Sequence, residues 1–434
     1  MRRLLIVSLL MAAVPGAAQA PAAPVSAPSI APDSSILQSR ANDAMLVFNE
    51  AKSAELVFSP EFLQHVPPAK LAELARSLSD QFGPILSIGE FERASPVTAK
   101  FNFHYAKAVA KVQMRIDPES SLISGLLITD VAPLEDSPEL IQSDFSALHG
   151  AAGFTIFKLG PGTPQEVLGY QSNREFAIGS AFKLWVFDAL AEDVARGKRK
   201  WSDVVFLTVR SFPSGVMHSW PQGSPVTLAT LATQMISVSD NTATDMLIKV
   251  LGREAIAMRV RANGHSAPSM MLPVLSTLEA FSLKLGPTDQ RAAYAAASDA
   301  QQQAMLVRLD PTFSVDKLDL GLLAPGKIWS IDTIEWFASP RDLVGVLQSL
   351  ARRKDPRVMQ ILAINPGLGP DLARLFTSFG FKGGSEEGVL NLSFVVQNRK
   401  GEWYVISASW NDPAQPVDQA QFVSLTRRLI ERIK

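Results

Sequence analysis

The sequence contains no cysteine, and this absence removes several classes of chemistry. Disulfide bonds, zinc sites built on thiolates and catalysis by a thiol nucleophile are all excluded. Histidine is scarce as well, because the chain has only five, and no two of them stand at the spacing of a metal-ligand pair. We therefore expect no metal site and no other cofactor.

Net charge and long apolar runs are also lacking. The formal net charge is -1, which argues against nucleic acid as a partner. After the N-terminal segment, no stretch approaches the roughly 18 uncharged apolar residues that a membrane helix needs. With 47% hydrophobic and 19% charged residues the chain is typical of folded protein, and its 434 residues are enough for two domains.

The N-terminal segment has the three parts of a secretory signal. A basic start, Met1–Arg3, precedes an apolar run from Leu4 to about Val14 and a small-residue triplet at 18–20. We predict cleavage after this triplet and an exported protein, periplasmic or secreted, without a membrane span. An uncleaved anchor is the alternative, but a Pro-Gly pair and the cleavage triplet oppose it. Residues 21–37, rich in Ala, Pro and Ser, are predicted to be a flexible linker.

Residues 38–135 show helical patterns followed by strand patterns. Apolar residues recur at helical spacing between Ser39 and Ser79, and the period then changes to two. The predicted strands are 85–91, 99–105, 108–116 and 122–128. This order indicates an α+β domain and resembles the nuclear-transport-factor-2-like (NTF2-like, or ketosteroid-isomerase-like) cone. Such cones can hold a ligand, but His104 and Tyr105 have no identifiable acidic partner, which favours a structural role.

Residues 136–434 are predicted to form a second domain, with strands near both ends and helices between them. The predicted strands are 153–157, 166–170, 390–397 and 403–410, and the terminal helix is 419–433. Strands at both ends of the segment indicate one sheet that the two ends complete together.

The first motif of this domain pairs Ser180 with Lys183 at the start of a helix. Side chains three residues apart lie on one helical face, so hydroxyl and amine come near hydrogen-bonding distance. An unprotonated lysine can take the serine proton, and the apolar neighbours of Lys183 would depress its pKa in that direction. The alternative for this motif alone is a helix cap with a solvated lysine.

Two further motifs are Ser239-Asp240-Asn241 and Lys382-Gly383-Gly384-Ser385. The first begins a helix, so it is either an ordinary cap or a source of a proton-relaying hydroxyl and a substrate-binding amide. The second precedes the closing hairpin, where glycines let a substrate approach a strand edge and the lysine can meet a carboxylate. By itself it could be a simple turn.

The ordered motifs resemble those of the class A β-lactamases and penicillin-binding proteins, whose signature is Ser-x-x-Lys, Ser-Asp-Asn and Lys-Thr-Gly. The resemblance covers roughly residues 150–434 and includes Ala338–Leu343, which looks like the start of a later helix in that family. It implies an α/β three-layer sandwich of β-lactamase/transpeptidase type, with an antiparallel sheet and a helical domain. It also implies a serine hydrolase with a small-molecule substrate.

The resemblance implies a role for each motif residue. Ser180 would be the acylated nucleophile, Lys183 its base or relay, and Ser239 the donor of a proton to the leaving group. The backbone N–H groups of Ser180 and Ser385 would form the oxyanion hole. The implied substrate-binding residues are Asn241, Lys382, Gly383, Gly384 and Ser385.

Two departures from the family pattern bear on turnover. Gly383 replaces a hydroxyl-bearing residue, so one hydrogen bond to a substrate carboxylate is lost unless Ser385 supplies it. The family's Glu-x-x-Leu-Asn segment, whose glutamate activates the deacylating water, is not found. Glu279 and Glu335 are candidate replacements, although an isolated helical glutamate is usually solvated.

The leading functional hypothesis is β-lactam hydrolysis through an acyl-enzyme on Ser180. A penicillin-binding or sensing module that is acylated without turnover is an alternative, which the missing glutamate motivates. A cell-wall peptidase or an esterase is also compatible, because the family changes substrate through loops and pocket shape. A third possibility makes the N-terminal domain the functional part, with an inactive hydrolase domain.

Overall fold

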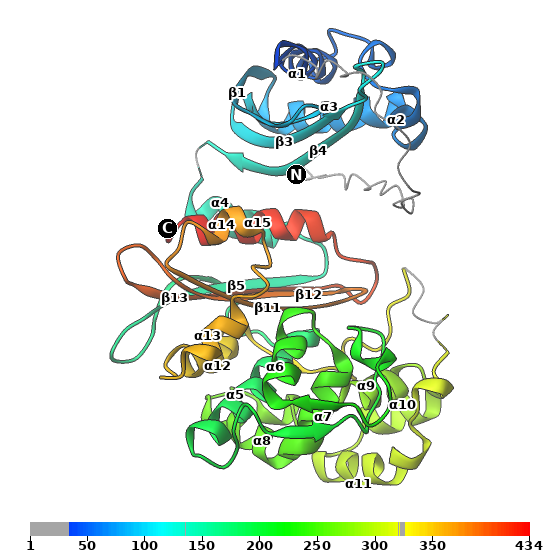
Figure 1. Ribbon diagram of the computed structural model, residues 1–434, viewed down its shortest axis with the longest axis vertical. Helices are drawn as coiled ribbons and strands as arrows, with labels where there is room; N and C mark the ends of the chain where they lie inside the picture. The colour runs from blue at the N-terminus through cyan, green and yellow to red at the C-terminus, as the bar shows by residue number, and fades with distance from the viewer. Residues whose placement is uncertain (1–33, 135, 320, 322–325) are drawn as a thin grey trace, which may run out of the picture. The chain divides into compact units, whose positions relative to one another are not determined.

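The structure is a computed structural model that describes residues 34–134, 136–319, 321 and 326–434. The chain divides into two compact units after Ile141, a few residues beyond the predicted domain boundary at 135/136. Each unit has a main sheet of its own (Figure 1).

The N-terminal predictions fall mostly outside the described residues. The predicted signal sequence, residues 1–20, lies there, and so does the predicted linker up to residue 33. Helix α1 begins at Ser34, so the last residues of the predicted linker belong to its first turn. Among the described residues, no helix combines the length and the apolar character required to cross a bilayer.

The N-terminal unit consists of helices followed by strands, as its sequence patterns predict. The helices are α1 (Ser34–Phe48), α2 (Pro60–His65) and α3 (Pro68–Phe82). The strands are β1 (Ile85–Ser95), β2 (Thr98–Tyr105), β3 (Ala108–Ile116) and β4 (Ile123–Pro133), and they form an antiparallel sheet in this order. Alternate residues of β3 are buried against leucines of α3, in a core of this unit's own. The predicted α+β architecture is confirmed.

The C-terminal unit is built on a five-stranded antiparallel sheet in the order β11-β12-β13-β5-β6. Its strands are β5 (Ala151–Leu159), β6 (Gln165–Tyr170), β11 (Ser378–Glu386), β12 (Val389–Gln397) and β13 (Trp403–Asn411). Because β13 pairs with β5, the two ends of the unit complete one sheet, which confirms the prediction. Strand β11 lies at an edge of this sheet.

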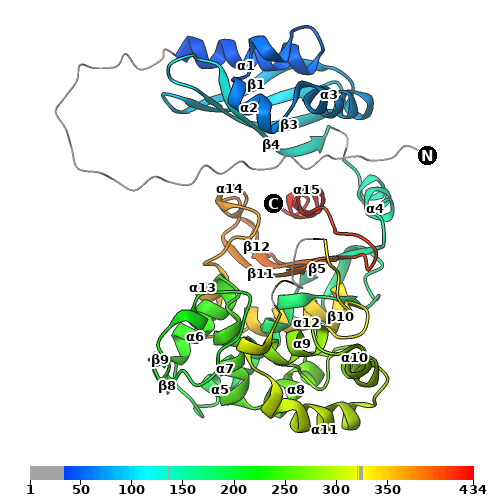
Figure 2. The same ribbon diagram turned by 90° about the vertical axis from the view of Figure 1, so that its right-hand side faces the viewer.

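Helices cover both faces of the sheet, so the unit has layers on either side of it (Figures 1 and 2). On one face, Phe145 of α4 (Pro138–Ser146) and Phe422 of α15 (Gln419–Glu431) contact each other, and their rings also pack on Phe154 and Trp410 of the strands. On the other face lie α12 (Pro340–Ala351) and α13 (Pro356–Leu362). With both faces covered, every residue of β12 except the last is buried.

The remaining helices form a helical part around α5 (Lys183–Ala195). They are α6 (Leu228–Ser237), α7 (Asn241–Leu251), α8 (Arg253–Ala262), α9 (Thr277–Lys284), α10 (Thr288–Ala295) and α11 (Asp299–Leu309). The exception is α14 (Pro370–Ala373), which lies beside α15 over the other face of the sheet (Figures 1 and 2). Every residue of α5 from Lys183 to Ala191 is buried, because other helices and the sheet surround it. A helix buried on all sides holds its first turn in a fixed place.

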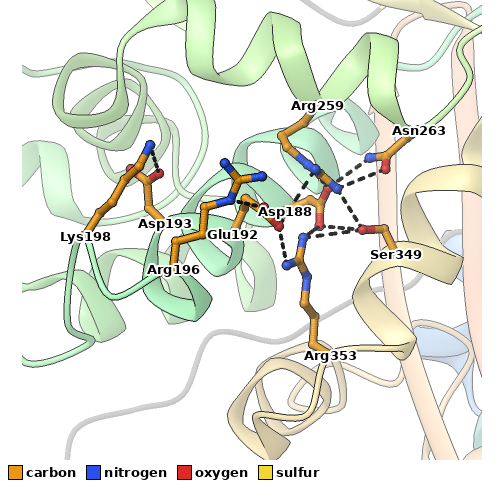
Figure 3. A network of polar contacts seen from close by, with 9 residues as sticks. All are labelled: Asp188, Glu192, Asp193, Arg196, Lys198, Arg259, Asn263, Ser349 and Arg353. Carbon is orange, nitrogen blue, oxygen red and sulfur yellow. Dashed lines mark hydrogen bonds and ion pairs between the residues drawn. The ribbon is translucent and has the colours of Figure 1, made fainter.

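A buried carboxylate anchors the middle of α5 (Figure 3). The Asp188 side chain is 0% exposed and accepts hydrogen bonds from Arg259 of α8 (2.7 Å) and Arg353 (2.7 Å). Asn263 and Ser349 donate two more, at 2.9 Å each. Four donors from two segments, residues 259–263 and 349–353, therefore hold one side chain, and this network fixes the axial position of α5.

Replacing Asp188 with alanine is expected to destabilise the C-terminal unit by about 3–5 kcal/mol, because two guanidinium groups would remain partly buried without their counter-ion. Urea unfolding measures this change. Glu254→Gln is the matched control, since the Glu254 side chain is 78% exposed and its ion pair with Arg261 should contribute less than about 1 kcal/mol. Equal stability of the two variants would contradict the anchoring role.

Candidate active site

The turn that carries Ser180 follows the short strand β7 (Phe176–Ala177), which pairs with β10 (Phe337–Ala338). The chain then passes through Gly179 with φ at +48°, a left-handed conformation that favours glycine, into the 3-10 turn η2 (Gly179–Phe182). Helix α5 begins directly after it at Lys183. The first motif therefore lies at a helix start, as predicted, with Ser180 partly exposed and Lys183 buried.

The edge strand β11 lies directly against this turn. A Cβ atom at Gly384 would stand 2.5 Å from the backbone nitrogen of Ser180 and 2.7 Å from that of Ala181. A Cβ atom at Gly179 would likewise stand 3.2 Å from the backbone nitrogen of Ser385. Two glycines thus allow a close backbone approach, in which the Ser180 amide lies beside Gly384 and the Ser385 amide beside Gly179.

With the Ser180 and Ser385 amides as the predicted oxyanion hole, replacing Gly384 with alanine is expected to lower kcat of the predicted hydrolysis by a factor on the order of 10² to 10³, the usual cost of losing one oxyanion donor. The added methyl group must displace β11 from the Ser180 amide, and both partners in this contact are backbone. Gly160→Ala is the matched control, because no heavy atom lies within 4 Å of a Cβ at that position. Steady-state kinetics measure kcat for both variants. An unchanged kcat in Gly384→Ala would show that the contact between Gly384 and the Ser180 amide is not needed for activity.

The buried Lys183 makes three polar contacts below the turn. Its Nζ atom lies 2.6 Å from the carbonyl oxygen of Ser239, 3.1 Å from Ser239 Oγ and 2.7 Å from Asn241 Oδ1. Burial and the nearby Lys382 hold the pKa of Lys183 well below its usual value, although the Asp245 and Asp240 carboxylates oppose this shift.

The contacts of Lys183 can satisfy an ammonium, whose three N–H donors meet three oxygen atoms, and they also accommodate an unprotonated amine. Such an amine has two N–H donors and one lone pair. The Ser239 carbonyl and Asn241 Oδ1 can only accept hydrogen bonds, so they take both donors. In the structure Nζ donates to Ser239 Oγ at 3.1 Å, and in the unprotonated amine the lone pair would face that oxygen.

The second motif combines a cap with a strained serine. Ser239 has φ at +59°, which is costly for a non-glycine residue and is typical of functional sites. Asp240 is the N-cap of α7: its carboxylate accepts from Ala243 N (2.9 Å), and also from Val216 N (2.7 Å) and Met217 N (2.8 Å). The cap interpretation is confirmed for Asp240. Ser239 and Asn241 contact Lys183, and their functional roles stay predictions.

Lys382, on β11, reaches the same serine from the other side. Its Nζ atom lies 3.1 Å from Ser239 Oγ and also contacts the carbonyl oxygen of Gly383. Burial lowers the pKa of Lys382 to about 7. Ser239 Oγ thus stands between two buried lysines whose pKa values are both lowered.

A cavity of about 380 Å³ unites the three motifs. The predicted site residues that line it are Ser180, Ser239, Asn241, Lys382, Gly383, Gly384 and Ser385. Lys183 lies beneath the cavity wall and contacts Ser239 and Asn241. Ser385 also supplies a hydroxyl to the cavity next to Gly383, the position where the sequence lacks one.

The sequence profile of the beta-lactamase enzyme family matches residues 139–433. The chain belongs to the beta-lactamase enzyme family. A family of this kind acts on small-molecule substrates. No curated protein matches the sequence.

Solved structures of similar fold are distant from this family member in sequence. A beta-lactamase from Sphaerobacter thermophilus DSM 20745 is 20% identical, with a TM-score of 0.46 over 68% of this chain and 93% of that chain. A beta-lactamase from Chitinophaga pinensis DSM 2588 is 14% identical, with a TM-score of 0.46 over 68% and 98%. A protein described as PBP-A is 17% identical, with a TM-score of 0.45 over 68% and 94%.

The two candidate glutamates of this beta-lactamase family member lie in different surroundings. Glu279 is buried as the N3 residue of a capping box with Ser276, and it also pairs with Arg253. It is not among the residues that line the cavity, so the structure assigns it a structural contact instead of the suggested catalytic one. Glu335 does line the cavity. Its Oε1 atom lies 2.5 Å from Nζ of Lys284.

Sequence reasoning missed Lys284 and Glu386 of this site. Glu386 lines the cavity and contacts Lys284 Nζ. Glu386 directly follows the third motif, and this adjacency is the one signal that could have drawn attention to it.

A possible metal-ligand cluster lies elsewhere in the unit. Ligand atoms of Glu175, His265 and Asp342 lie within 4.8 Å of one another. Both ring nitrogens of His265 have backbone partners, however: Nε2 lies 2.9 Å from the carbonyl oxygen of Phe337 and Nδ1 lies 3.2 Å from the amide of Ala267. The cluster is thus a hydrogen-bonded junction, and the expectation of no metal site stays a prediction.

Proposed function

We propose that this chain is a serine hydrolase that forms an acyl-enzyme on Ser180 and hydrolyses β-lactams or related esters and amides. The observation that carries the proposal is the shared cavity, where a partly exposed serine stands one turn before a buried lysine of lowered pKa. Nucleophile, base and amide donors are the three requirements of acyl transfer to serine.

In the proposed acylation step, Ser180 Oγ attacks the substrate carbonyl carbon, and its proton passes to the amine of Lys183, directly or through Ser239. The carbonyl oxygen becomes an oxyanion, which accepts hydrogen bonds from the backbone N–H groups of Ser180 and Ser385. When the C–N bond breaks, the leaving nitrogen takes a proton from the Ser239 hydroxyl, which Lys183 replaces. Every proton is then accounted for.

Lys382 and Ser385 are the proposed carboxylate ligands. Lys382 carries its charge below its pKa of about 7, so it attracts a substrate carboxylate most strongly in that range. The hydroxyl of Ser385 supports the same role, since Gly383 offers none. Asn241 is the proposed amide donor to the acyl side chain.

The proposal is tested by mass spectrometry of the intact protein after incubation with a reporter penicillin and a chromogenic cephalosporin. We expect an adduct on Ser180 together with steady-state turnover. An adduct without turnover would instead identify a penicillin-binding or sensing module, for which the missing Glu-x-x-Leu-Asn segment is the supporting observation. No adduct with either compound would sink the proposal.

For the N-terminal unit, we propose an NTF2-like domain with an accessory role. Its helices followed by a four-stranded antiparallel sheet support this assignment. Removing residues 38–135 and assaying cephalosporin turnover tests the role: retained turnover supports an accessory domain, whereas full loss would assign it a direct part in activity. We also propose export with cleavage after Ala20, which predicts a mature N-terminus at Pro21.

A further inference from the structure

A buried cluster of one lysine and two glutamates forms a wall of the cavity. Lys284, at the end of α9, contacts Glu335 and Glu386, which come from distant segments of the chain. The Lys284 and Glu335 side chains are 3% and 2% exposed, whereas that of Glu386 is 20% exposed. Glu386 is therefore the member of this Lys284 cluster that water in the cavity can reach.

Strand geometry places Glu386 on the face of β11 that meets Ser180. Side chains of a strand alternate between its faces, so Lys382, Gly384 and Glu386 share one face, and β11 pairs with β12 without a register shift. Gly384 on that face contacts the Ser180 amide. Lys382 and Glu386 thus flank the nucleophile, and each Cα lies about 7 Å along the strand from that of Gly384.

Glu335 approaches the same turn from the opposite side. The following residue, Trp336, accepts a hydrogen bond from Ile178 N at 3.0 Å through its carbonyl oxygen. Its ring stacks on Phe182 with centroids 3.9 Å apart and planes at 3°. The segment that carries Glu335 is therefore fixed to both sides of Ser180 in the sequence, and it holds Lys284 beside Glu386.

The charges of the Lys284 cluster favour one proton shared between the carboxyl groups of Glu335 and Glu386. Burial raises the pKa of Glu386 to about 8; Lys284 opposes this rise, and the Glu335 carboxylate adds to it. Burial also opposes the charge of Lys284, but Glu335 and Glu386 outweigh burial and raise its pKa above the usual value. A carboxyl group with a pKa of about 8 can both take up and release a proton near neutral pH.

We propose that Glu386 is the general base that activates the deacylating water, with Lys284 and Glu335 as its positioning residues. This inference rests on the proposed acyl-enzyme at Ser180. It supplies the function of the missing Glu-x-x-Leu-Asn glutamate from a strand instead of a loop.

In this step, the Glu386 carboxylate takes one proton from a water molecule as the water oxygen bonds to the acyl carbon. The resulting oxyanion is held by the Ser180 and Ser385 amides. The bond from the acyl carbon to Ser180 Oγ then breaks, and Oγ receives the proton from Glu386. The products are the free acid and the free serine, so one water molecule is consumed and no other reactant is needed.

The test compares Glu386→Gln with the neighbouring Glu387→Gln, whose side chain is not among the cavity-lining residues. With a chromogenic cephalosporin, we expect Glu386→Gln to be acylated at the wild-type rate and deacylated more slowly by a factor on the order of 10² to 10⁴. Stopped-flow absorbance should show one equivalent of burst, and mass spectrometry should show the adduct on Ser180. Glu387→Gln should behave as wild type.

The possible outcomes separate the two proposals. Clearance of the adduct at the wild-type rate in Glu386→Gln would overturn the role of Glu386 and leave the acyl-enzyme intact. A wild-type adduct that Glu386→Gln fails to form would also overturn it, because the residue would then be needed before deacylation. If wild-type protein forms no adduct, the proposed function itself fails.

The pH profile is a readout that a purely structural role would not move. The wild-type deacylation rate should rise with pH and level off above about 8, because the base must be ionised. Lys284→Met removes the charge that lowers the pKa of Glu386, so the inflection should move to higher pH. A flat profile in wild-type protein, or an unmoved inflection in Lys284→Met, would overturn the proposal.

Discussion

Replacing Ser180 with alanine is expected to lower kcat for a chromogenic cephalosporin by a factor on the order of 10⁴ to 10⁶. In the proposed mechanism the acyl-enzyme forms on the Ser180 hydroxyl, beside the backbone contact between this turn and β11. KM should change far less than kcat, because the proposed substrate-binding residues Lys382 and Asn241 are unchanged in this variant. Steady-state kinetics over a range of cephalosporin concentrations measure both parameters.

The matched control for Ser180→Ala is Ser202→Ala, an exposed serine of the same unit. It should retain wild-type kcat and KM. Turnover that persists in Ser180→Ala at more than a hundredth of the wild-type rate would assign the nucleophile to another residue.

Replacing Lys183 with methionine is expected to lower the acylation rate by a factor on the order of 10² to 10⁴, because Ser180 loses its proton acceptor. Stopped-flow measurement of the burst phase isolates this step. Lys249→Met, which changes an exposed lysine of α7, is the control and should be acylated normally. An unchanged burst rate in Lys183→Met would remove Lys183 from the chemistry.

The same Lys183→Met variant that loses activity should gain folding stability at neutral pH relative to wild type. The pKa of Lys183 in the folded protein lies well below the ordinary 10.5, so the unfolded chain binds this proton more readily. Folding stability is therefore lost as the pH falls from about 10.5 toward the lowered pKa. Methionine carries no such proton, so the variant should gain stability relative to wild type as the pH falls through this window. Urea unfolding at pH 10 and pH 7 measures the difference.

Local patterns predicted most of the fold. The strands of both units follow alternating apolar patterns, and the pairing of β5 with β13 follows from strands at both ends of the C-terminal unit. The three motifs were also recognisable, because residue types and spacing within each motif are local features. The structure adds that they line one cavity, which no local pattern could establish.

The parts of the site that escaped prediction depend on contacts between distant segments. Lys284 and Glu386 lie on separate elements, α9 and β11, and each alone looks like an ordinary charged residue. Glu335 was a candidate from the sequence, but its contact with Lys284 was not predictable. The left-handed backbone conformation of Ser239 was also not predictable, because serine has no preference for positive φ. For Asp240, the sequence predicted the helix cap. It did not predict that the same carboxylate also accepts hydrogen bonds from the backbone of the 214–217 loop.

Helix α5 begins at Lys183, beside the cavity, and extends for about 20 Å. Within the described part of the chain, the side chain of Asp188 bonds to residues outside the cavity lining, yet its loss would loosen the helix whose first turn carries the proposed reacting groups. A screen for inactive variants would therefore score Asp188 beside Ser180 as essential. Thermal melting of purified variants would separate the two, because only a weakened scaffold melts early.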